Sequence, residues 1–237
     1  MIYCLGNSHA SIFSGAPPCG NLVGKKNQNK DGVGDACDPN PSYPQLRTVY
    51  LGGALSYNFT TKYLPNVYHW IDRLGASKEN DILLFCVGEI DCRWHLPKKS
   101  ETLGIDKRDV VVECVDRFFE SFKILKSEGW RVIVCGTQPT TILPGLGIPD
   151  LDDQRYNGEP RWGDCSFRNE ICKIWNDYMS EKCDKNKIPF VSIYDRLVDE
   201  DNITKTEYFK DYCHLIYDKC LPMFIEELEK VNFENYF

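Results

Sequence analysis

The fold is decided at residues 2–10, which read Ile-Tyr-Cys-Leu-Gly-Asn-Ser-His-Ala. The mostly apolar run 2–5 predicts a short buried strand, and the glycine after it marks the end of that strand. A serine that follows such a strand stands at the turn into a helix, where backbone amides can stabilise a developing oxyanion. Ser8 is therefore a candidate nucleophile, and the alternative is that its hydroxyl only caps the helix.

Further apolar runs at 48–51, 82–87, 131–135 and 190–193 predict four more strands. Between and after them, apolar residues recur at helical spacing over 66–74, 109–127, 167–183 and 217–231. Strands that alternate with helices predict a mostly parallel five-stranded sheet covered on both faces, with ligands at the carboxyl ends of the strands. We expect a single domain over residues 1–237, interrupted by long insertions at about 14–45 and 140–164.

Composition excludes several classes of protein. The chain has 237 residues, of which 42% are hydrophobic and 27% charged, as in an ordinary globular domain. The net charge of −7 and the lack of a long basic stretch argue against a nucleic-acid partner, and no apolar run is long enough to predict a membrane span. Cys4, Cys86 and Cys135 fall in apolar strands, which favours buried thiols, a reducing compartment and a cytoplasmic location.

A second candidate group lies just before the last predicted helix, in Asp211-Tyr212-Cys213-His214. An aspartate and a histidine three residues apart can lie on one side of a turn. The carboxylate then fixes the imidazole tautomer, and the other ring nitrogen faces a nucleophile. The alternative is a surface aspartate beside a half-buried histidine.

Taken together, these signals resemble the SGNH (GDSL-type) hydrolases, whose four sequence blocks match Gly6-Asn7-Ser8, Gly52, Gly88-Glu89-Ile90-Asp91 and Asp211-x-x-His214. The resemblance covers nearly the whole chain, in the same order and structural context. It implies a three-layer αβα sandwich of flavodoxin-like type. It also implies that Ser8 is the nucleophile, His214 the base and Asp211 its orienting acid, with the backbone amides of Ser8 and Gly52 in the oxyanion hole.

The third block departs from this family pattern. Where the family has an asparagine whose side chain donates to the oxyanion, this chain has Ile90, which cannot donate. Removal of one such donor costs on the order of 100- to 1000-fold in rate. Arg93 is the nearest candidate to replace it, because its guanidinium is a permanent donor. The alternative is that Glu89, Asp91 and Arg93 form a structural ion-pair cluster.

The first insertion carries alternating oxygen-bearing side chains over residues 27–38, which read Asn-Gln-Asn-Lys-Asp-Gly-Val-Gly-Asp-Ala-Cys-Asp. Such a pattern around a tight glycine turn suits a hard cation, and it resembles one calcium loop of thrombospondin type 3 repeats. A structural calcium is therefore one interpretation, and a polar loop without a metal is the other.

The sequence thus predicts a serine-dependent ester hydrolase or acyltransferase of SGNH type that needs no cofactor. Its expected substrate is a small-molecule or glycan ester, with an O-acyl group, above all O-acetyl, on a carbohydrate, and the sugar part rests on the family resemblance. Because of Ile90, a catalytically impaired protein with a glycan-binding or structural role stays open. A nucleotide-binding protein is disfavoured, since no glycine-rich phosphate loop follows the first strand.

Overall fold

A six-stranded sheet forms the centre of the molecule in the computed structural model, which describes residues 1–15, 33–140, 155–156, 159–160, 162–211 and 213–231. The strand order is β2-β3-β1-β4-β5-β8, and every neighbouring pair is parallel except β2 with β3. The strands are β1 (Ile2–Gly6), β2 (Asp35–Pro39), β3 (Leu46–Tyr50), β4 (Ile82–Cys86), β5 (Arg131–Cys135) and β8 (Phe190–Val191). The predicted α/β class with a mostly parallel sheet is confirmed.

The predicted number of five strands is wrong, because β2 adds a sixth strand at the edge of the sheet. It lies in the segment expected to be an insertion, and its sequence Asp-Ala-Cys-Asp-Pro has no apolar run. An edge strand can be polar and can end in proline, since one side of its backbone needs no partner. Apolar patterning therefore misses such a strand.

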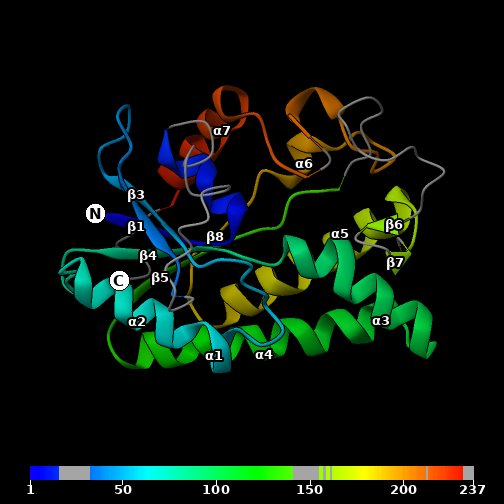
Figure 1. Ribbon diagram of the computed structural model, residues 1–237, viewed down its shortest axis with the longest axis horizontal. Helices are drawn as coiled ribbons and strands as arrows, with labels where there is room; N and C mark the ends of the chain where they lie inside the picture. The colour runs from blue at the N-terminus through cyan, green and yellow to red at the C-terminus, as the bar shows by residue number, and fades with distance from the viewer. Residues whose placement is uncertain (16–32, 141–154, 157–158, 161, 212, 232–237) are drawn as a thin grey trace.

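Two apolar layers enclose the sheet, because successive side chains of each strand point to opposite faces. On one face Leu5, Phe85 and Val134 pack against the helices α2 (Leu64–Arg73), α4 (Lys107–Ser127) and α5 (Cys165–Lys185). On the other face Cys4, Leu84 and Cys135 pack against η1 (Ser8–Ser14) and α7 (Tyr217–Glu229). Figure 1 shows α4 and α5 below the sheet and α7 above it. This is the expected three-layer αβα arrangement.

All four predicted helices are present, with different ends. The described helices are η1 (Ser8–Ser14), α1 (Phe59–Lys62), α2 (Leu64–Arg73), η2 (Asp91–His95), α3 (Leu96–Leu103), α4 (Lys107–Ser127), α5 (Cys165–Lys185), α6 (Tyr194–Leu197), η3 (Thr206–Tyr208) and α7 (Tyr217–Glu229). The helices α4 and α5 begin two residues earlier than predicted, each after an aspartate, Asp106 or Asp164, that accepts a backbone N–H of the first turn. These caps precede the first apolar residue of each pattern, so periodicity alone misses them.

The two predicted insertions are described only in part. Residues 27–32 of the proposed calcium loop lie outside the described residues, and Asp35 to Asp38 belong to the edge strand β2. The calcium site stays a prediction. In the second insertion, β6 (Arg155–Tyr156) and β7 (Glu159–Pro160) form a two-stranded antiparallel sheet.

Ten of the cysteines in the described ranges have free thiols, and nine of these are buried, among them Cys4, Cys86 and Cys135. Burial raises the pKa of the Cys4 and Cys135 thiols well above its ordinary value, so both stay protonated. Cys37, by contrast, is disulfide-bonded, and the reducing, cytoplasmic location stays a prediction. Within the described residues no helix combines the length and the apolar character needed to cross a membrane.

Candidate active site

Ser8 lies at the carboxyl end of the central strand, where the chain turns sharply into η1. Gly6 lets the end of β1 lie close against β4, because a Cβ atom at that position would overlap the carbonyl oxygen of Cys86. Asn7 caps the new helix, since its side-chain Oδ1 accepts the backbone N–H of His9 at 3.0 Å. The cap is therefore Asn7, and the hydroxyl of Ser8 is left for another partner.

That partner is His214, whose Nε2 lies 2.9 Å from Ser8 Oγ. On the other side of the ring, His214 Nδ1 lies 2.9 Å from Oδ2 of Asp211. The structure thus joins Ser8, His214 and Asp211 in one chain of hydrogen bonds, although Ser8 and His214 are 206 positions apart in the sequence. A proton on Nδ1 that is donated to Asp211 leaves Nε2 free to accept the proton of Ser8.

A tight hairpin holds the aspartate and the histidine. The strand-like bridge between Phe209 and Leu215 closes it, and the N–H of Lys210 donates to the carbonyl of His214 at 2.9 Å. Within the turn, Asp211 Oδ1 accepts the backbone N–H groups of Cys213 and His214 at 2.9 and 2.7 Å. Burial alone would raise the pKa of Asp211, but these bonds and His214 outweigh it and hold that pKa well below its usual range. Asp211 is therefore a carboxylate.

The residues predicted for the oxyanion hole lie close to the nucleophile strand, but they are not all free to donate. Gly52 follows β3 in a left-handed conformation with φ of +71°, next to Leu51, whose N–H donates to the carbonyl of Gly6. Arg93 donates from Nε to Glu89 Oε1 at 2.5 Å and from Nη2 to Glu89 Oε2 at 3.4 Å. The ion-pair interpretation of Glu89 and Arg93 is therefore borne out, and the role of Arg93 as an oxyanion donor stays a prediction.

Asp91 is not part of that ion pair. It is fully buried, and its Oδ2 accepts both the backbone N–H and the hydroxyl of Ser56 at 2.7 Å. Burial raises the pKa of Asp91 in spite of these bonds. This contact ties the loop after β3 to the start of η2, so Asp91 acts on the shape of the site and not on the substrate.

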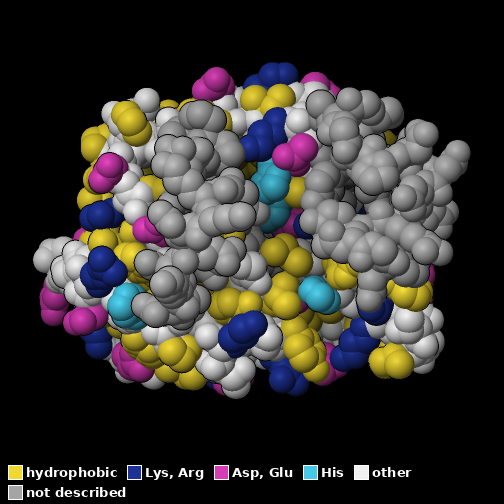
Figure 2. Space-filling model, viewed as in Figure 1, with side chains coloured by type: hydrophobic (Ala, Val, Ile, Leu, Met, Phe, Trp, Pro, Cys, Tyr) yellow, Lys and Arg dark blue, Asp and Glu magenta, His cyan; other side chains and the backbone are white. Residues whose placement is uncertain are grey.

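A cavity of about 360 Å³ opens at Ser8 and His214. Its wall mixes polar and apolar side chains, namely Ser8, His9, Ser11, Ile12, Gln138, Lys210, His214, Leu215, Ile216, Tyr217 and Asp218, with Gly15. On the face of the molecule seen in Figure 2, histidine side chains are visible in a hollow near the centre. Neither Gly52 nor Arg93 lines this cavity.

Sequence reasoning missed two residues beside the candidate triad, of which His9 contacts it directly and Gln138 contacts the residue before His214. His9 stacks on His214 with ring centroids 4.9 Å apart, and Gln138 donates to the carbonyl of Cys213 at 2.5 Å. His9 follows Ser8 directly, and Gln138 comes three residues after the end of β5. Both therefore stand at the carboxyl edge of the sheet, and this position was the signal in the sequence that could have found them.

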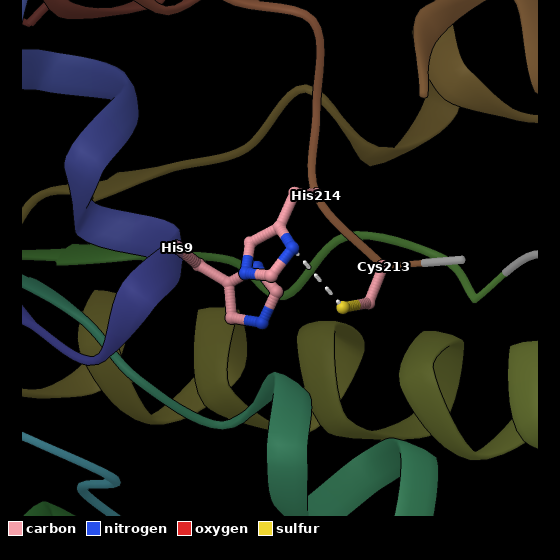
Figure 3. Close-up of side chains that lie close together, drawn as sticks. All are labelled: His9, Cys213 and His214. Carbon is pink, nitrogen blue, oxygen red and sulfur yellow. Dashed lines mark hydrogen bonds between the residues drawn. The ribbon is translucent and has the colours of Figure 1, made fainter. Parts of the chain in front are cut away.

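Three potential metal ligands also meet here: His9, Cys213 and His214 offer ligand atoms within 4.8 Å of one another (Figure 3). Their donor atoms are already engaged. The ring nitrogens of His9 contact Glu89 and Gln138, and those of His214 contact Asp211 and Ser8. Cys213 Sγ lies 3.4 Å from His214 Nδ1. Because the ring nitrogens already contact protein groups, the cluster offers a metal ion no unengaged histidine nitrogen.

No protein-family model matches the chain, and no curated protein matches it in sequence. Solved structures do match. One is described as a GDSL-like lipase from Bacteroides thetaiotaomicron, with a TM-score of 0.54 and 16% identity over 96% of this chain and 86% of that one. Another, described provisionally as an acylhydrolase from Bacteroides fragilis, has a TM-score of 0.52 and 17% identity over 96% of this chain and 85% of that one. The chain therefore has the α/β fold of the SGNH (GDSL-type) hydrolases.

Proposed function

We propose that this chain is a serine-dependent ester hydrolase or acyltransferase. The observation that carries the proposal is the chain of hydrogen bonds from Ser8 through His214 to Asp211, with both outer contacts at 2.9 Å. A nucleophile, a base within hydrogen-bond reach and a group that orients the base are the parts that acyl transfer requires. The cavity beside Ser8 provides room for the ester.

The proposed reaction has two steps. In the first, Ser8 Oγ bonds to the acyl carbon while His214 Nε2 takes the hydroxyl proton and the carbonyl electron pair moves to the oxygen. His214 then gives this proton to the leaving alcohol, and an acyl-serine results. In the second step, water or a sugar hydroxyl attacks the acyl-serine while His214 takes its proton. The bond from the acyl carbon to Ser8 Oγ then breaks, and His214 returns the proton to Ser8 Oγ. Asp211 stays ionised and stabilises the positive charge of His214 in both steps.

For the substrate we propose a short acyl ester, such as O-acetyl, on a polar alcohol such as a carbohydrate. The cavity supports this choice, because Ile12 and Leu215 give it an apolar side while Ser11, Lys210 and Asp218 supply polar groups around the same space. A volume of about 360 Å³ suits a small ester better than a long acyl chain. The carbohydrate part of the proposal comes from the family resemblance.

The test is hydrolysis of p-nitrophenyl acetate and of acetylated sugars. Release of p-nitrophenolate measures the first reaction, and release of acetate measures the second. We expect turnover of the acetyl ester and weaker turnover of esters with long acyl chains. If a folded protein turns over none of these esters, with water or with sugar acceptors, the impaired binding protein is the better description.

Ile90 is the residue that supports the alternative of an impaired binding protein, since its hydrocarbon side chain cannot donate a hydrogen bond to an oxyanion. We expect Ile90→Asn to raise kcat on p-nitrophenyl acetate by up to about 100-fold, the lower end of what one such donor supplies. Steady-state kinetics at one pH, with the folded fraction checked by circular dichroism, measures this gain.

The matched control is Ile203→Asn, which makes the same exchange at a side chain that is 59% exposed. It should leave kcat unchanged. If Ile90→Asn folds and gives no gain while the wild type is active, the oxyanion hole already has its full set of donors.

A further inference from the structure

His9 lies beside the candidate triad and contacts it face to face. The ring planes of His9 and His214 form an angle of only 24°, and the ring centroids are 4.9 Å apart. Figure 3 shows the two rings stacked. His9 Nε2 lies 2.6 Å from Glu89 Oε2, and His9 Nδ1 lies 2.6 Å from Gln138 Nε2. The side chains of His9 and Glu89 are only 3% and 4% exposed. Every polar atom of this buried ring therefore has a partner.

These partners decide which nitrogen of His9 carries the proton. Gln138 Nε2 also lies 2.5 Å from the carbonyl oxygen of Cys213, which only accepts, so the amide must point its nitrogen at that oxygen. The second hydrogen of the same nitrogen points at His9 Nδ1, which must then be an acceptor. His9 is consequently neutral, and it donates its single proton from Nε2 to Glu89.

The charges around His9 agree with this assignment. Burial lowers the pKa of His9 and outweighs the attraction of Glu89. Burial alone would raise the pKa of Glu89, but Arg93 and His9 outweigh it and keep that pKa well below its usual range. Glu89 is thus an anion whose charge Arg93 balances through the 2.5 Å contact, so His9 need not be a cation.

A neutral His9 matters because His214 becomes positive when it takes the proton of Ser8. An imidazolium at His9 would repel that charge across the stacked rings. A neutral ring that donates to an anion instead offers its negative face to it. Gln138 acts in the same direction, since its bond to the carbonyl of Cys213 holds the peptide that precedes His214.

We propose that His9, held as its neutral Nε2–H tautomer by Gln138 and Glu89, is a positioning residue that keeps His214 in place and stabilises its protonated form. The catalytic half of this statement rests on the proposed function, while the protonation state of His9 does not. His9 keeps its proton throughout, and the only proton that moves is the one from Ser8 to His214 and on to the leaving alcohol. Other titratable or charged groups near the two rings are Arg93, Lys210, Asp211, Cys213 and Asp218.

The protonation state can be measured without any substrate, by the nitrogen resonances of the imidazole rings. The chain has four histidines, so His9→Phe and His69→Phe assign two of them by loss of signal. We expect His9 to be neutral at pH 7 with its proton on Nε2, and to gain a second proton only below the ordinary imidazole value of about 6.5. A His9 that is protonated on Nδ1 at pH 7, or that gains its second proton at or above about pH 6.5, would overturn the proposal.

The dependence of stability on pH gives a second readout without substrate. Because the pKa of His9 is lowered in the folded chain, the unfolded chain binds one more proton between that pKa and about 6.5. This contribution to stability is present above about pH 6.5 and is lost as the pH falls below it. Urea unfolding from pH 7 to pH 5 should therefore show a slope for the wild type that exceeds that of His9→Phe by up to one proton. His69→Phe, at an exposed histidine that also packs on an aromatic ring, should keep the wild-type slope. Equal slopes for all three proteins would contradict a buried neutral His9.

The catalytic half is tested with Glu89→Gln, which removes the negative charge that His9 and Arg93 contact. His214 should then be harder to protonate, so the acid limb of kcat/KM moves to lower pH. In the same variant kcat should fall about tenfold, which corresponds to about 1.4 kcal/mol in the transition state. KM should stay unchanged. A purely structural role would lower the folded fraction without moving the acid limb.

The matched control is Glu113→Gln, which removes a glutamate that also pairs with an arginine four residues later, on the exposed face of α4. It should leave the acid limb and kcat unchanged. An active wild type whose acid limb stays in place in a folded Glu89→Gln would overturn this role of His9 and leave the proposed function intact. A wild type that neither turns over esters nor reacts with serine reagents would instead defeat the proposed function, and the nitrogen resonances would still decide the state of His9.

Discussion

Ser8→Ala is expected to lower kcat on an acetyl ester by about a million-fold, the scale seen when a serine nucleophile is removed from an intact triad. No acyl-serine can form in this variant, so only binding and the remaining donors act on the substrate. The fold should not change, because the hydrogen bond recorded for Ser8 Oγ is the one to His214 and the cap of η1 is Asn7. Initial rates on p-nitrophenyl acetate, with unfolding curves for both proteins, measure this loss.

Ser11→Ala is the control for this substitution. Ser11 stands one turn later in η1 and lines the same cavity, so it tests the loss of a hydroxyl from the cavity wall. We expect less than about a tenfold change in kcat, since a neutral hydrogen bond contributes about 0.5–1.5 kcal/mol. Hydrolysis by Ser8→Ala within tenfold of the wild type would show that another group is the nucleophile.

Asp211→Asn is the second large effect, with an expected fall of about 10⁴-fold in kcat. The asparagine oxygen can still accept the N–H groups of Cys213 and His214, so the turn is preserved. Its amide nitrogen, however, donates to His214 Nδ1 and moves the ring proton to Nε2, the nitrogen that faces Ser8. A protonated Nε2 cannot take the serine proton.

Asp199→Asn controls for the loss of a charge from a turn. Asp199 Oδ1 also accepts two backbone N–H groups ahead of it, those of Asp201 and Ile203, at 3.0 and 2.8 Å. Asp199→Asn should leave kcat unchanged, and it should lower the free energy of unfolding by about as much as Asp211→Asn does. If Asp211→Asn keeps kcat within tenfold of the wild type, Asp211 does not set the tautomer of His214.

The parallel core of the sheet could be predicted because its strands are apolar on both faces. Runs such as 82–87 and 131–135 have that composition only when helices cover both sides. The edge strand β2 could not be predicted, since a strand with one free side carries little apolar patterning. The helix η2 was missed for a related reason: a short π-helical segment such as 91–95, which carries Arg93 and His95, shows no repeat at helical spacing.

The contact between Ser8, Asp211 and His214 could be anticipated because each residue stands at a recognisable turn and the carboxyl ends of parallel strands share one edge. The network around His9 could not. Whether Glu89 pairs with Arg93, His9 or the substrate depends on side-chain directions at the ends of β1 and β4, and no spacing in the sequence encodes them. Gln138 shows the same limit, because its partner is a backbone carbonyl 75 residues away.

The most direct measurement of the central claim is labelling of the purified protein with a fluorophosphonate, followed by mass spectrometry of its peptides. The account predicts one label per chain, on the Ser8 hydroxyl, with no label on Ser8→Ala and much slower labelling of Asp211→Asn. A folded protein that takes no label, or takes it on a serine other than Ser8, would contradict the account.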